Sequence, residues 1–358
     1  MTLTSTATDR APGDAGPGAP ATAPARRFVV ESQARVLSLP DGVVVRLGTA
    51  VTHLRGTGVA RFVPALIRTA DHGVLTLHLA DVPQPRRAQL EGLLAQLSDC
   101  GLLVELSGPG PVPDPTVLAA ASRIGRGTDP EVVGERRAAG RVLLTGDSRL
   151  AGTVADACSA AGLQVERAAL GSIDPVELPA HTVPVVCGAH EDDPALLSWN
   201  TAALAAGRGT RWLAVTPFDG EHALVGPWVL AGVSACYRCF RLRRAAVHAR
   251  EDVADLLAVA EPGEVFGDPS RRHPGLNLVQ AGLVVERLLE LHAFAGSGPQ
   301  SVPGGLTTVG IGEQGVEVTQ HRVLRVPRCP ECSPARDRGF PQVWFSRSPG
   351  ESAPAGTP

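Results

Sequence analysis

The stretch HALVGPWVLAGVSACYRCFRLRR (222–244) joins a long apolar run to a CxxC pair, Cys236 and Cys239, followed by an arginine-rich segment. A second CxxC pair, Cys329 and Cys332, lies in VLRVPRCPECS (323–333). Each pair can hold one face of a metal ion, and four thiolates without histidine complete a closed tetrahedral zinc site. We therefore expect these four cysteines to bind one structural Zn²⁺ that ties together two distant segments. The alternatives are a redox CxxC or unrelated core cysteines, although neither pair follows the first strand of a thioredoxin-like βαβ unit.

Around these cysteines, short buried strands alternate with helical segments, which predicts a parallel α/β sheet in a unit spanning 136–333. The strand candidates are GRVLLTG (140–146), LQVERAAL (163–170), VPVVCGAH (183–190) and RWLAVTPF (211–218). Helices are expected at TVADACSAAGLQ (153–164), LLSWNTAALAAG (196–207) and 275–294. Two further strands, TTVGIGEQ (307–314) and GVEVTQHRVLRV (315–326), complete the unit.

A second, smaller unit is expected over residues 27–106. It opens with three short strand candidates, ARVLSLP (34–40), GVVVRLG (42–48) and AVTHLRG (50–56), the first two joined by the hairpin signal Asp41-Gly42. Helical spacing follows in 58–73 and 85–103, with a short helical or extended piece at 75–81. This order is typical of a small winged-helix domain. Residues 107–135, with GPGPVPDP (108–115), are predicted to form a linker, and 1–26 and 334–358 disordered tails.

The strand–loop–helix segment VLLTGDSRLAGTVADA (142–157) is similar to the start of a dinucleotide-binding unit. Gly146, Ser148 and Ala151 occupy the three GxGxxG positions, so only the first is glycine. The middle glycine normally lets the backbone approach a phosphate, and Ser148 would crowd it. Glu166 lies where a ribose contact is expected, but such a residue often occurs by chance. The prediction is a retained fold without bound nucleotide.

Composition excludes several classes of function. The net charge is −3 and no lysine occurs, so no bulk attraction to nucleic acid is expected. No apolar run reaches the length of a membrane span, and no signal peptide opens the chain, so we expect a cytoplasmic protein. No GxSxG, HExxH or Walker A motif is present, and no catalytic set is predicted. The single cysteines Cys100, Cys158 and Cys187 are interpreted as small buried hydrophobes.

The segments 222–244 and 323–333 resemble the zinc-knuckle region of ThiF-like, ubiquitin-activating-type adenylating proteins. Residues 27–106 resemble the PqqD-like peptide-recognition domain that precedes this region in one branch, the bacteriocin-type (Ocin-ThiF-like) proteins of thiazole/oxazole-modified peptide pathways. The resemblance implies a winged-helix PqqD-like domain followed by a degenerate ThiF-like Rossmann-type domain with a four-cysteine zinc site. The loop GDSRLA and the lack of lysine depart from the adenylating relatives, and no counterpart of their catalytic cysteine is evident.

The resemblance further implies a function without independent catalysis. Such a protein binds the leader of a ribosomally made precursor peptide, as in thiopeptide-like antibiotic biosynthesis, and presents it to a separate YcaO-type, ATP-dependent cyclodehydratase that forms azolines from Cys, Ser or Thr. The leader would add a strand to the strand at 50–56 and rest on the helix at 86–99. The implied contacts are Ala50, Val51, Thr52, His53, Leu54, Gln89, Leu90, Leu93, Leu94 and Leu97.

Two other functions remain open from the sequence. The first is an active adenylating enzyme that acts on a peptide or protein C-terminus, which the missing lysines and broken glycine loop disfavour. The second is a structural zinc protein that only assembles other enzymes. From pattern alone, the strand at 50–56 could also be a solvated edge without a partner. A homodimer is compatible with all three functions.

Overall fold

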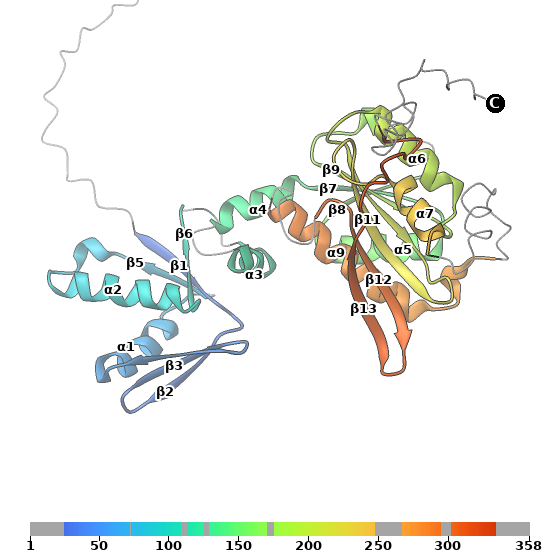
Figure 1. Cartoon of the computed structure of the whole chain (residues 1–358). Coiled ribbons are helices and arrows are strands. Elements are labelled where there is room, and N and C mark those ends of the chain that lie inside the picture. Colours follow the sequence, from blue (N-terminus) through green and yellow to red (C-terminus); the bar gives the residue numbers. More distant parts are fainter. Residues whose placement is uncertain are drawn as a thin grey trace, which may run out of the picture. The chain divides into compact units, whose positions relative to one another are not determined.

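The computed structural model describes residues 25–71, 73–108, 110, 113–124, 129–169, 175–247, 267–294 and 302–333. The chain divides into two compact units, Met1–Val132 and Val133–Pro358, which are described separately (Figure 1). The predicted tails fall outside the described residues, apart from residues 25 and 26. Among the described helices, none is long and apolar enough to cross a membrane.

Within the first unit, residues 26–106 form two small antiparallel sheets and the helices α1 (Thr57–Arg68) and α2 (Arg86–Asp99). One sheet has the order β2-β3-β4, formed by β2 (Arg35–Leu39), β3 (Gly42–Leu47) and β4 (Ala50–Arg55). The other has the order β5-β1-β6, formed by β1 (Arg26–Val30), β5 (Val74–Leu77) and β6 (Leu103–Leu106). A 3₁₀ turn, η1 (Leu79–Asp81), lies between α1 and α2 in the chain.

One apolar core holds these elements together. Phe28 from β1, Val45 from β3 and Leu97 from α2 are almost completely buried in it. The second sheet has no strong sequence signal, because its strands are short and each is hydrogen-bonded only to a strand far away in the sequence, β1 to both β5 and β6. Pairing with β1 also decides the conformation of segment 75–81, for which the sequence allows a helical or an extended structure. Its first residues join β1 as β5, and only η1 is helical.

Two helices occupy the segment that the sequence predicts as a linker, α3 (Pro115–Ile124) and α4 (Pro130–Ala139). Each begins with an Asp-Pro pair. The Asp114 carboxylate accepts the Thr116 N–H at 2.8 Å, and the Asp129 carboxylate accepts the Glu131 N–H at 2.9 Å. Aspartate as N-cap followed by proline at the first helical position is a helix start signal. The prolines that suggested a linker therefore begin helices.

The second unit is built on a seven-stranded mixed sheet of order β13-β12-β11-β10-β9-β7-β8. Four strands are parallel, as in a Rossmann-like fold: β7 (Arg141–Thr145), β8 (Gln164–Ala168), β9 (Thr182–Cys187) and β10 (Arg211–Thr216). Three antiparallel strands extend the sheet: β11 (His222–Leu230), β12 (Gly305–Gly312) and β13 (Gly315–Arg322). The alternation of strands and helices in the sequence therefore predicts the four parallel strands correctly, whereas the whole sheet is mixed.

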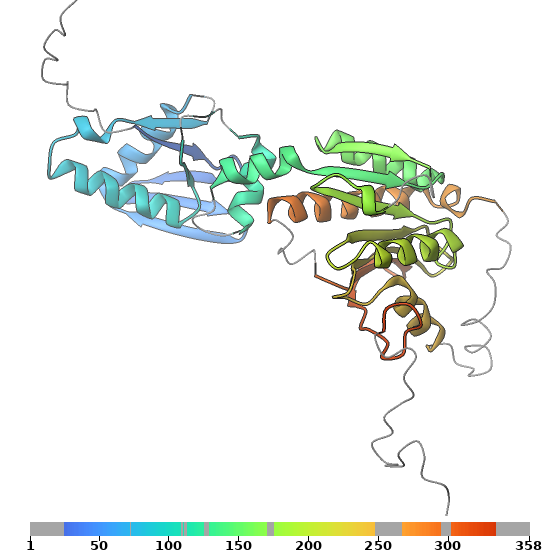
Figure 2. The same ribbon diagram turned by 90° about the horizontal axis from the view of Figure 1, so that it is seen from above.

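Helices cover both faces of this sheet (Figure 2). On one face, α5 (Arg149–Ala160) and α9 (Pro274–Ala293) pack on β7, β9 and β10. On the other, α6 (Pro194–Ala205) and α7 (Tyr237–Ala245) pack around Trp199 and Trp212. Two short 3₁₀ turns, η2 (Pro175–Glu177) and η3 (Pro269–Arg271), lie in the connections. The first cysteine pair lies between the end of β11 and the first turn of α7, and the second pair follows the end of β13.

Candidate functional site

The first cysteine pair lies where the chain leaves β11 and enters α7. Cys236 is the N-cap residue of α7, and Cys239 lies in its first turn. The turn between β11 and α7 is held by Ser234, whose hydroxyl accepts the Leu230 N–H at 2.8 Å and donates to the Ala235 carbonyl at 2.9 Å. Because a CxxC pair at a helix start projects both sulfurs to the same side, this local geometry presents Cys236 and Cys239 together.

The second pair lies in the tight loop that follows β13. The Cys329 N–H donates to the Val326 carbonyl, and the Ser333 N–H donates to the Cys329 carbonyl. Helix α7 holds this loop through Arg243, whose Nε donates to the Leu324 carbonyl at 2.6 Å. The Val326 N–H also points at Cys239 Sγ, at 3.3 Å. The two cysteine loops thus contact each other directly through backbone groups.

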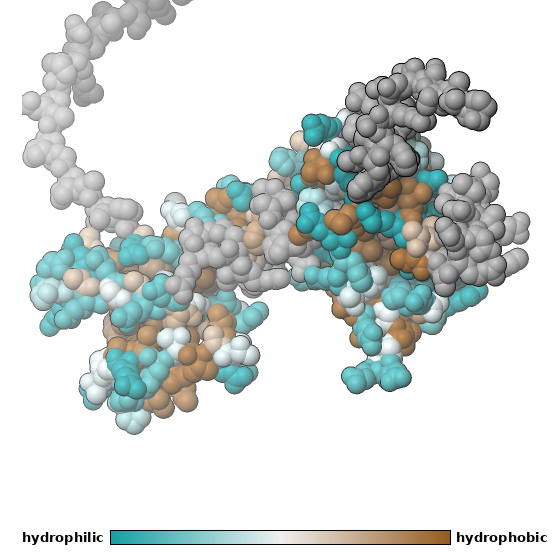
Figure 3. Space-filling model, viewed as in Figure 1, coloured by the Kyte–Doolittle hydropathy of each residue, from teal (hydrophilic) through white to brown (hydrophobic). Residues whose placement is uncertain are grey.

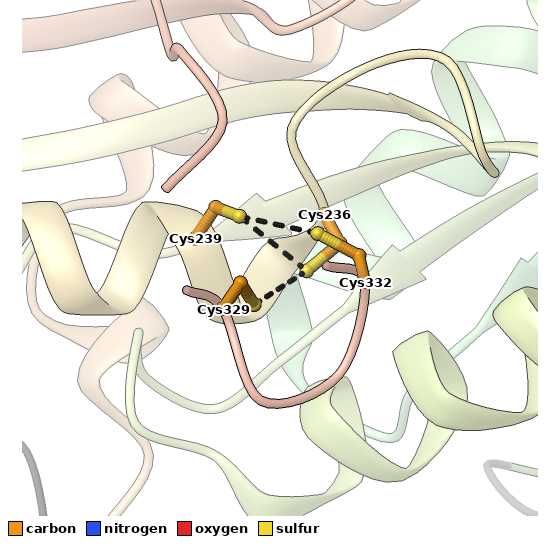
Figure 4. A group of neighbouring side chains, drawn as sticks. All are labelled: Cys236, Cys239, Cys329 and Cys332. Carbon is orange, nitrogen blue, oxygen red and sulfur yellow. Dashed lines mark hydrogen bonds between the residues drawn. The ribbon is translucent and has the colours of Figure 1, made fainter. Parts of the chain in front are cut away.

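The four sulfur atoms converge on one point (Figure 4). The Sγ atoms of Cys236 and Cys239 are 3.8 Å apart, those of Cys236 and Cys329 3.6 Å, and those of Cys239 and Cys332 3.4 Å. All four lie within 4.8 Å of one another. A disulfide bond is excluded, because it would need a separation of about 2.05 Å. Four sulfurs bound tetrahedrally to zinc at about 2.3 Å would be about 3.8 Å apart, so this cluster could hold a metal ion.

Mutual hydrogen bonding shifts the pKa values of these thiols in opposite directions, lowering two and raising two, while burial raises all four. Three of the four cysteines are at most 1% exposed, and Cys332 is half-buried. The hydrogen bond from Cys236 lowers the pKa of Cys239 to about 7 and holds the pKa of Cys332 well below its usual range. The hydrogen bond with Cys239 raises the pKa of Cys236. A bound cation would favour the thiolate at all four positions.

A buried asparagine that the sequence does not single out supports the cluster. Asn200 of α6 is fully buried, and its Oδ1 accepts the Tyr237 N–H at 2.8 Å at the start of α7. Its Nδ2 donates to the Glu331 carboxylate, between the two cysteines of the second pair. Asn200 therefore fixes both cysteine loops to the same helix. The sequence carries no local signal for it, because its partners lie far away along the chain.

The predicted nucleotide loop is filled by the protein's own side chains. The backbone N–H groups of Arg149, Leu150 and Ala151 open α5, where a Rossmann-type unit binds phosphate. Here the Arg149 N–H donates to Asp268 Oδ2 at 3.2 Å, and the Leu150 N–H donates to Ser270 Oγ at 3.3 Å. The Ala151 N–H donates to Ser148 Oγ at 3.2 Å. An anion at this helix start would have to displace the Asp268 carboxylate.

The three GxGxxG positions have structural roles here. Gly146 has a φ of 121°, and a Cβ on it would lie 2.3 Å from the Cys187 carbonyl oxygen, so this glycine permits close packing of β7 against β9. Ser148 is the N-cap of α5, and Ala151 is completely buried beneath the helix. Glu166 lies inside β8 opposite Leu143 rather than at the carboxyl end of the strand. The residues that fill the site, Asp268 and Ser270, follow β7 by more than a hundred positions, and only the start signal DPS marks them.

The predicted peptide contacts divide into an exposed and a buried group. Ala50, Val51, Thr52, His53 and Leu54 all lie in β4, which pairs with β3 and with no other strand that the structure describes. On α2, Gln89 is exposed, and Leu90 and Leu93 are half-buried. Leu94 and Leu97 are only 1% exposed because they point into the core of the unit. These two leucines hold α2 in place and do not face a ligand in this structure.

The hydrogen-bond pattern between β3 and β4 shows which backbone groups of β4 point away from β3. The Gly56 N–H donates to the Asp41 carbonyl, and the register of β3 and β4 continues without a shift. Because hydrogen-bonded pairs alternate along an antiparallel ladder, the N–H of Leu54 points toward β3 and that of His53 points outward. The outward backbone groups therefore belong to Val51, His53 and Arg55.

The two units define a class of protein: a small α/β unit with an open strand edge, joined to a Rossmann-like unit with a four-cysteine cluster. No protein-family model matches the sequence, and no curated protein matches it. Among solved structures, the heterocyclase TruD is similar over 87% of this chain, with a TM-score of 0.59 and 21% identity. A heterocyclase in complex with substrate and cofactor is similar over 86%, with a TM-score of 0.60 and 20% identity.

A further similar structure is E. coli MccB, with a TM-score of 0.51 and 14% identity over 86% of this chain. MccB has also been solved with ATP and with MccA. This chain spans 43% and 40% of the lengths of the two heterocyclases and 97% of the length of MccB. At these identities the likeness shows a shared fold, which this chain has in common with TruD and MccB.

Proposed function

We propose that this chain binds the leader region of a ribosomally made precursor peptide and presents it to a separate YcaO-type, ATP-dependent cyclodehydratase that forms azolines. The observation that carries the proposal is the open edge of β4 in a chain with the fold of a heterocyclase. In this proposal the cyclodehydratase corresponds to the part of TruD that this chain does not match.

The proposed mode of binding is addition of a peptide strand to β4 in a winged-helix-type, PqqD-like recognition domain. Val51, His53 and Arg55 would supply the main-chain hydrogen bonds, since their backbone groups face outward. Leu54 from β4 and Leu90 and Leu93 from α2 pack on the same core with part of their surface exposed, so they can contact side chains of the leader. The space-filling view shows further apolar surface on this unit (Figure 3). Leu37, Val51 and Phe62 are large apolar side chains of this unit that are exposed.

The metal in this proposal is Zn²⁺ with a structural role. Four thiolates leave no coordination position open for water or substrate, so the ion would hold α7 to the loop after β13 rather than take part in chemistry. The spacing of the sulfurs and their near-complete burial support this assignment. Arg238, Arg243 and Arg325 lie in or beside the two cysteine loops and would offset the negative charge of the tetrathiolate.

The alternative is an active adenylating enzyme. Its support is the likeness to MccB, which has been solved with ATP. Asp268 weighs against it, because its carboxylate occupies the helix start that would receive a phosphate and would repel one. The sequence also lacks lysine, a common phosphate ligand. A non-catalytic presenting subunit fits both observations.

The test compares two edge strands of the same sheet. His53→Pro removes an outward N–H from β4, and Ser38→Pro removes an outward N–H from β2, the opposite edge; neither change removes a hydrogen bond of the sheet. A fluorescent leader peptide, encoded beside the gene for this chain, is titrated against the full-length protein and both variants. We expect His53→Pro to weaken binding at least about tenfold, roughly 1.4 kcal/mol, while Ser38→Pro binds as wild type does.

Two outcomes would contradict this mode of binding. Equal affinity of His53→Pro and wild type would show that β4 is not the docking strand. Absence of leader binding by the wild type would remove the proposed function. Pyrophosphate exchange that depends on ATP and the peptide would favour the adenylating alternative. Elemental analysis of each variant confirms that the metal content of the second unit is unchanged.

A further inference from the structure

A cavity of about 760 Å³ lies in the second unit at the amino ends of the parallel strands. Thr182 and Val183 open β9 on one side of it, and Arg211 opens β10 on another. The last turns of α4 and α9 complete its wall. Because α5 begins at the carboxyl end of β7, this cavity is separate from the filled nucleotide loop. Its volume is within the range of small-ligand sites.

Two buried polar atoms in the wall have no partner among the residues that the structure describes. They are Nε2 of His292, a residue only 8% exposed, and Oγ1 of Thr182. Buried polar groups in folded proteins are nearly always hydrogen-bonded, so each exception needs an explanation. Both atoms can donate a hydrogen bond, the imidazole through Nε2–H and the threonine through its hydroxyl. The wall therefore offers two unused donors.

The cavity is also positively charged. Arg211 is half-buried and forms no ion pair or hydrogen bond within the described part of the chain, while Arg136 uses one nitrogen to donate to the Ala293 carbonyl at 3.2 Å. Among the described lining residues, Glu135 is the sole acid. Burial lowers the pKa of His292 to about 4, and its electrostatic interactions with His181, Arg137 and Arg211 add to this effect. His292 is therefore neutral at pH 7, in a site whose field favours an anion.

A strained residue borders the same cavity. His181 has a φ of 64°, and among the described residues it is the only non-glycine residue with positive φ. Its carbonyl accepts the Arg141 N–H at 3.1 Å, which pins the turn at the start of β7 and β9. Residues held in this conformation concentrate at ligand sites. Among the described residues, an arginine without an ion pair, two unused hydrogen-bond donors and a strained residue thus lie around the same cavity.

We propose that this cavity binds a small organic carboxylate with an apolar body. Arg211 receives the carboxylate, because a guanidinium fork matches its two oxygens. Thr182 and His292 donate the remaining hydrogen bonds. The apolar side chains of Leu178, Val183 and Leu291 enclose the body of the ligand. This site is independent of the proposed function, since leader binding at β4 uses no residue of the second unit.

The test uses a matched pair of probes on the full-length protein, 4-phenylbutyrate and the uncharged 4-phenyl-1-butanol. Binding is followed by calorimetry and by the NMR signals of the histidine rings. We expect the acid to bind and to shift the His292 signals, and the alcohol to bind at least about tenfold more weakly. Arg211→Gln should weaken binding of the acid by a similar factor. Arg322→Gln, on exposed β13 outside the cavity, is the control and should change nothing.

Thr182→Val is a second variant, nearly isosteric, that keeps the arginine and removes one donor. It should weaken binding of the acid several-fold. Thermal unfolding shows whether each variant is folded. The proposal is overturned if the acid does not bind wild type, if acid and alcohol bind equally, or if folded Arg211→Gln binds the acid as wild type does. If Arg211→Gln does not fold, unchanged affinity in Thr182→Val overturns the proposal instead.

Discussion

The cysteine cluster and the start of α5 are two potential ligand sites on one Rossmann-like sheet. They differ in whether side chains of the protein already occupy the site. At the cluster, four side chains from two distant segments meet, with neighbouring sulfurs 3.4–3.8 Å apart. At the start of α5, three backbone N–H groups point to one place, but Asp268, Ser270 and Ser148 already accept them. One site is arranged to receive a cation, and the other has its anion supplied by the protein.

The difference shows that the same scaffold can keep one site and close another at little energetic cost. Closing the α5 site needs only an aspartate in a connecting segment, because the helix start favours any nearby carboxylate. Loss of a bound metal would leave four sulfurs without a cation, and three of the cysteines are buried in the core around Trp212 and Tyr237. We therefore expect perturbations at the cluster to affect the whole unit, and perturbations at α5 to stay local.

The largest effect is expected from Cys329→Ser. Serine is a poor ligand for a soft cation, so the variant should lose the metal and several kcal/mol of unfolding free energy. Elemental analysis and chemical denaturation measure the two losses. Cys158→Ser is the control, since Cys158 is equally buried but lies in α5 outside the cluster, and it should keep the metal. Full metal content in Cys329→Ser would show that the four cysteines are not the ligands.

A smaller effect is expected from two buried asparagines, one serving each site. Asn200→Leu removes the partner of the Tyr237 N–H and one of the hydrogen bonds of the Glu331 carboxylate, and Asn277→Leu removes the hydrogen bond to the Ser270 carbonyl. Each should lower the unfolding free energy by about 2 kcal/mol. Only Asn200→Leu should speed release of the metal to a chelator. Equal release rates in the two variants would mean that Asn200 does not support the cluster.

Asp268→Ala should have a still smaller effect on stability, about 1 kcal/mol, because it removes one capping carboxylate from α5. It also uncovers the Arg149 N–H, so inorganic phosphate or ATP should raise the unfolding temperature of the variant and leave that of wild type unchanged. Equal stabilisation of both proteins would show that Asp268 does not block the site.

The smallest effect concerns pH. Burial raises the pKa of Asp268, but hydrogen bonds from Ser270 and from the Arg149 N–H outweigh it, so the folded-state pKa lies below its usual range. The unfolded carboxyl, with a pKa of about 3.9, then takes up protons first, and this stabilisation is present above that value and lost as the pH falls through the folded-state pKa. The stability gap between wild type and Asp268→Asn should therefore shrink below about pH 4. A stability difference that does not change with pH would show that the charge of the Asp268 carboxylate does not stabilise the fold.

These two sites also show what a sequence can reveal. The CxxC pairs predict the cluster because its ligands are side chains with a fixed pattern, and the apolar alternation predicts the parallel sheet. The loss of glycines at Ser148 and Ala151 indicates a weakened phosphate site. It does not reveal Asp268, which reaches α5 only through the fold. Likewise, the strand character of β1 and β6 depends on pairing with strands that are distant in the sequence, and the burial of Leu94 and Leu97 depends on how α2 is rotated.

The most direct measurement of the account is the metal content of the purified full-length chain, with a count of its reactive thiols in the native state. We expect one zinc per chain and four thiols that react only after the metal is removed by a chelator or the protein is unfolded. Protein that is folded and free of metal, with Cys236, Cys239, Cys329 and Cys332 readily titrated, would contradict it.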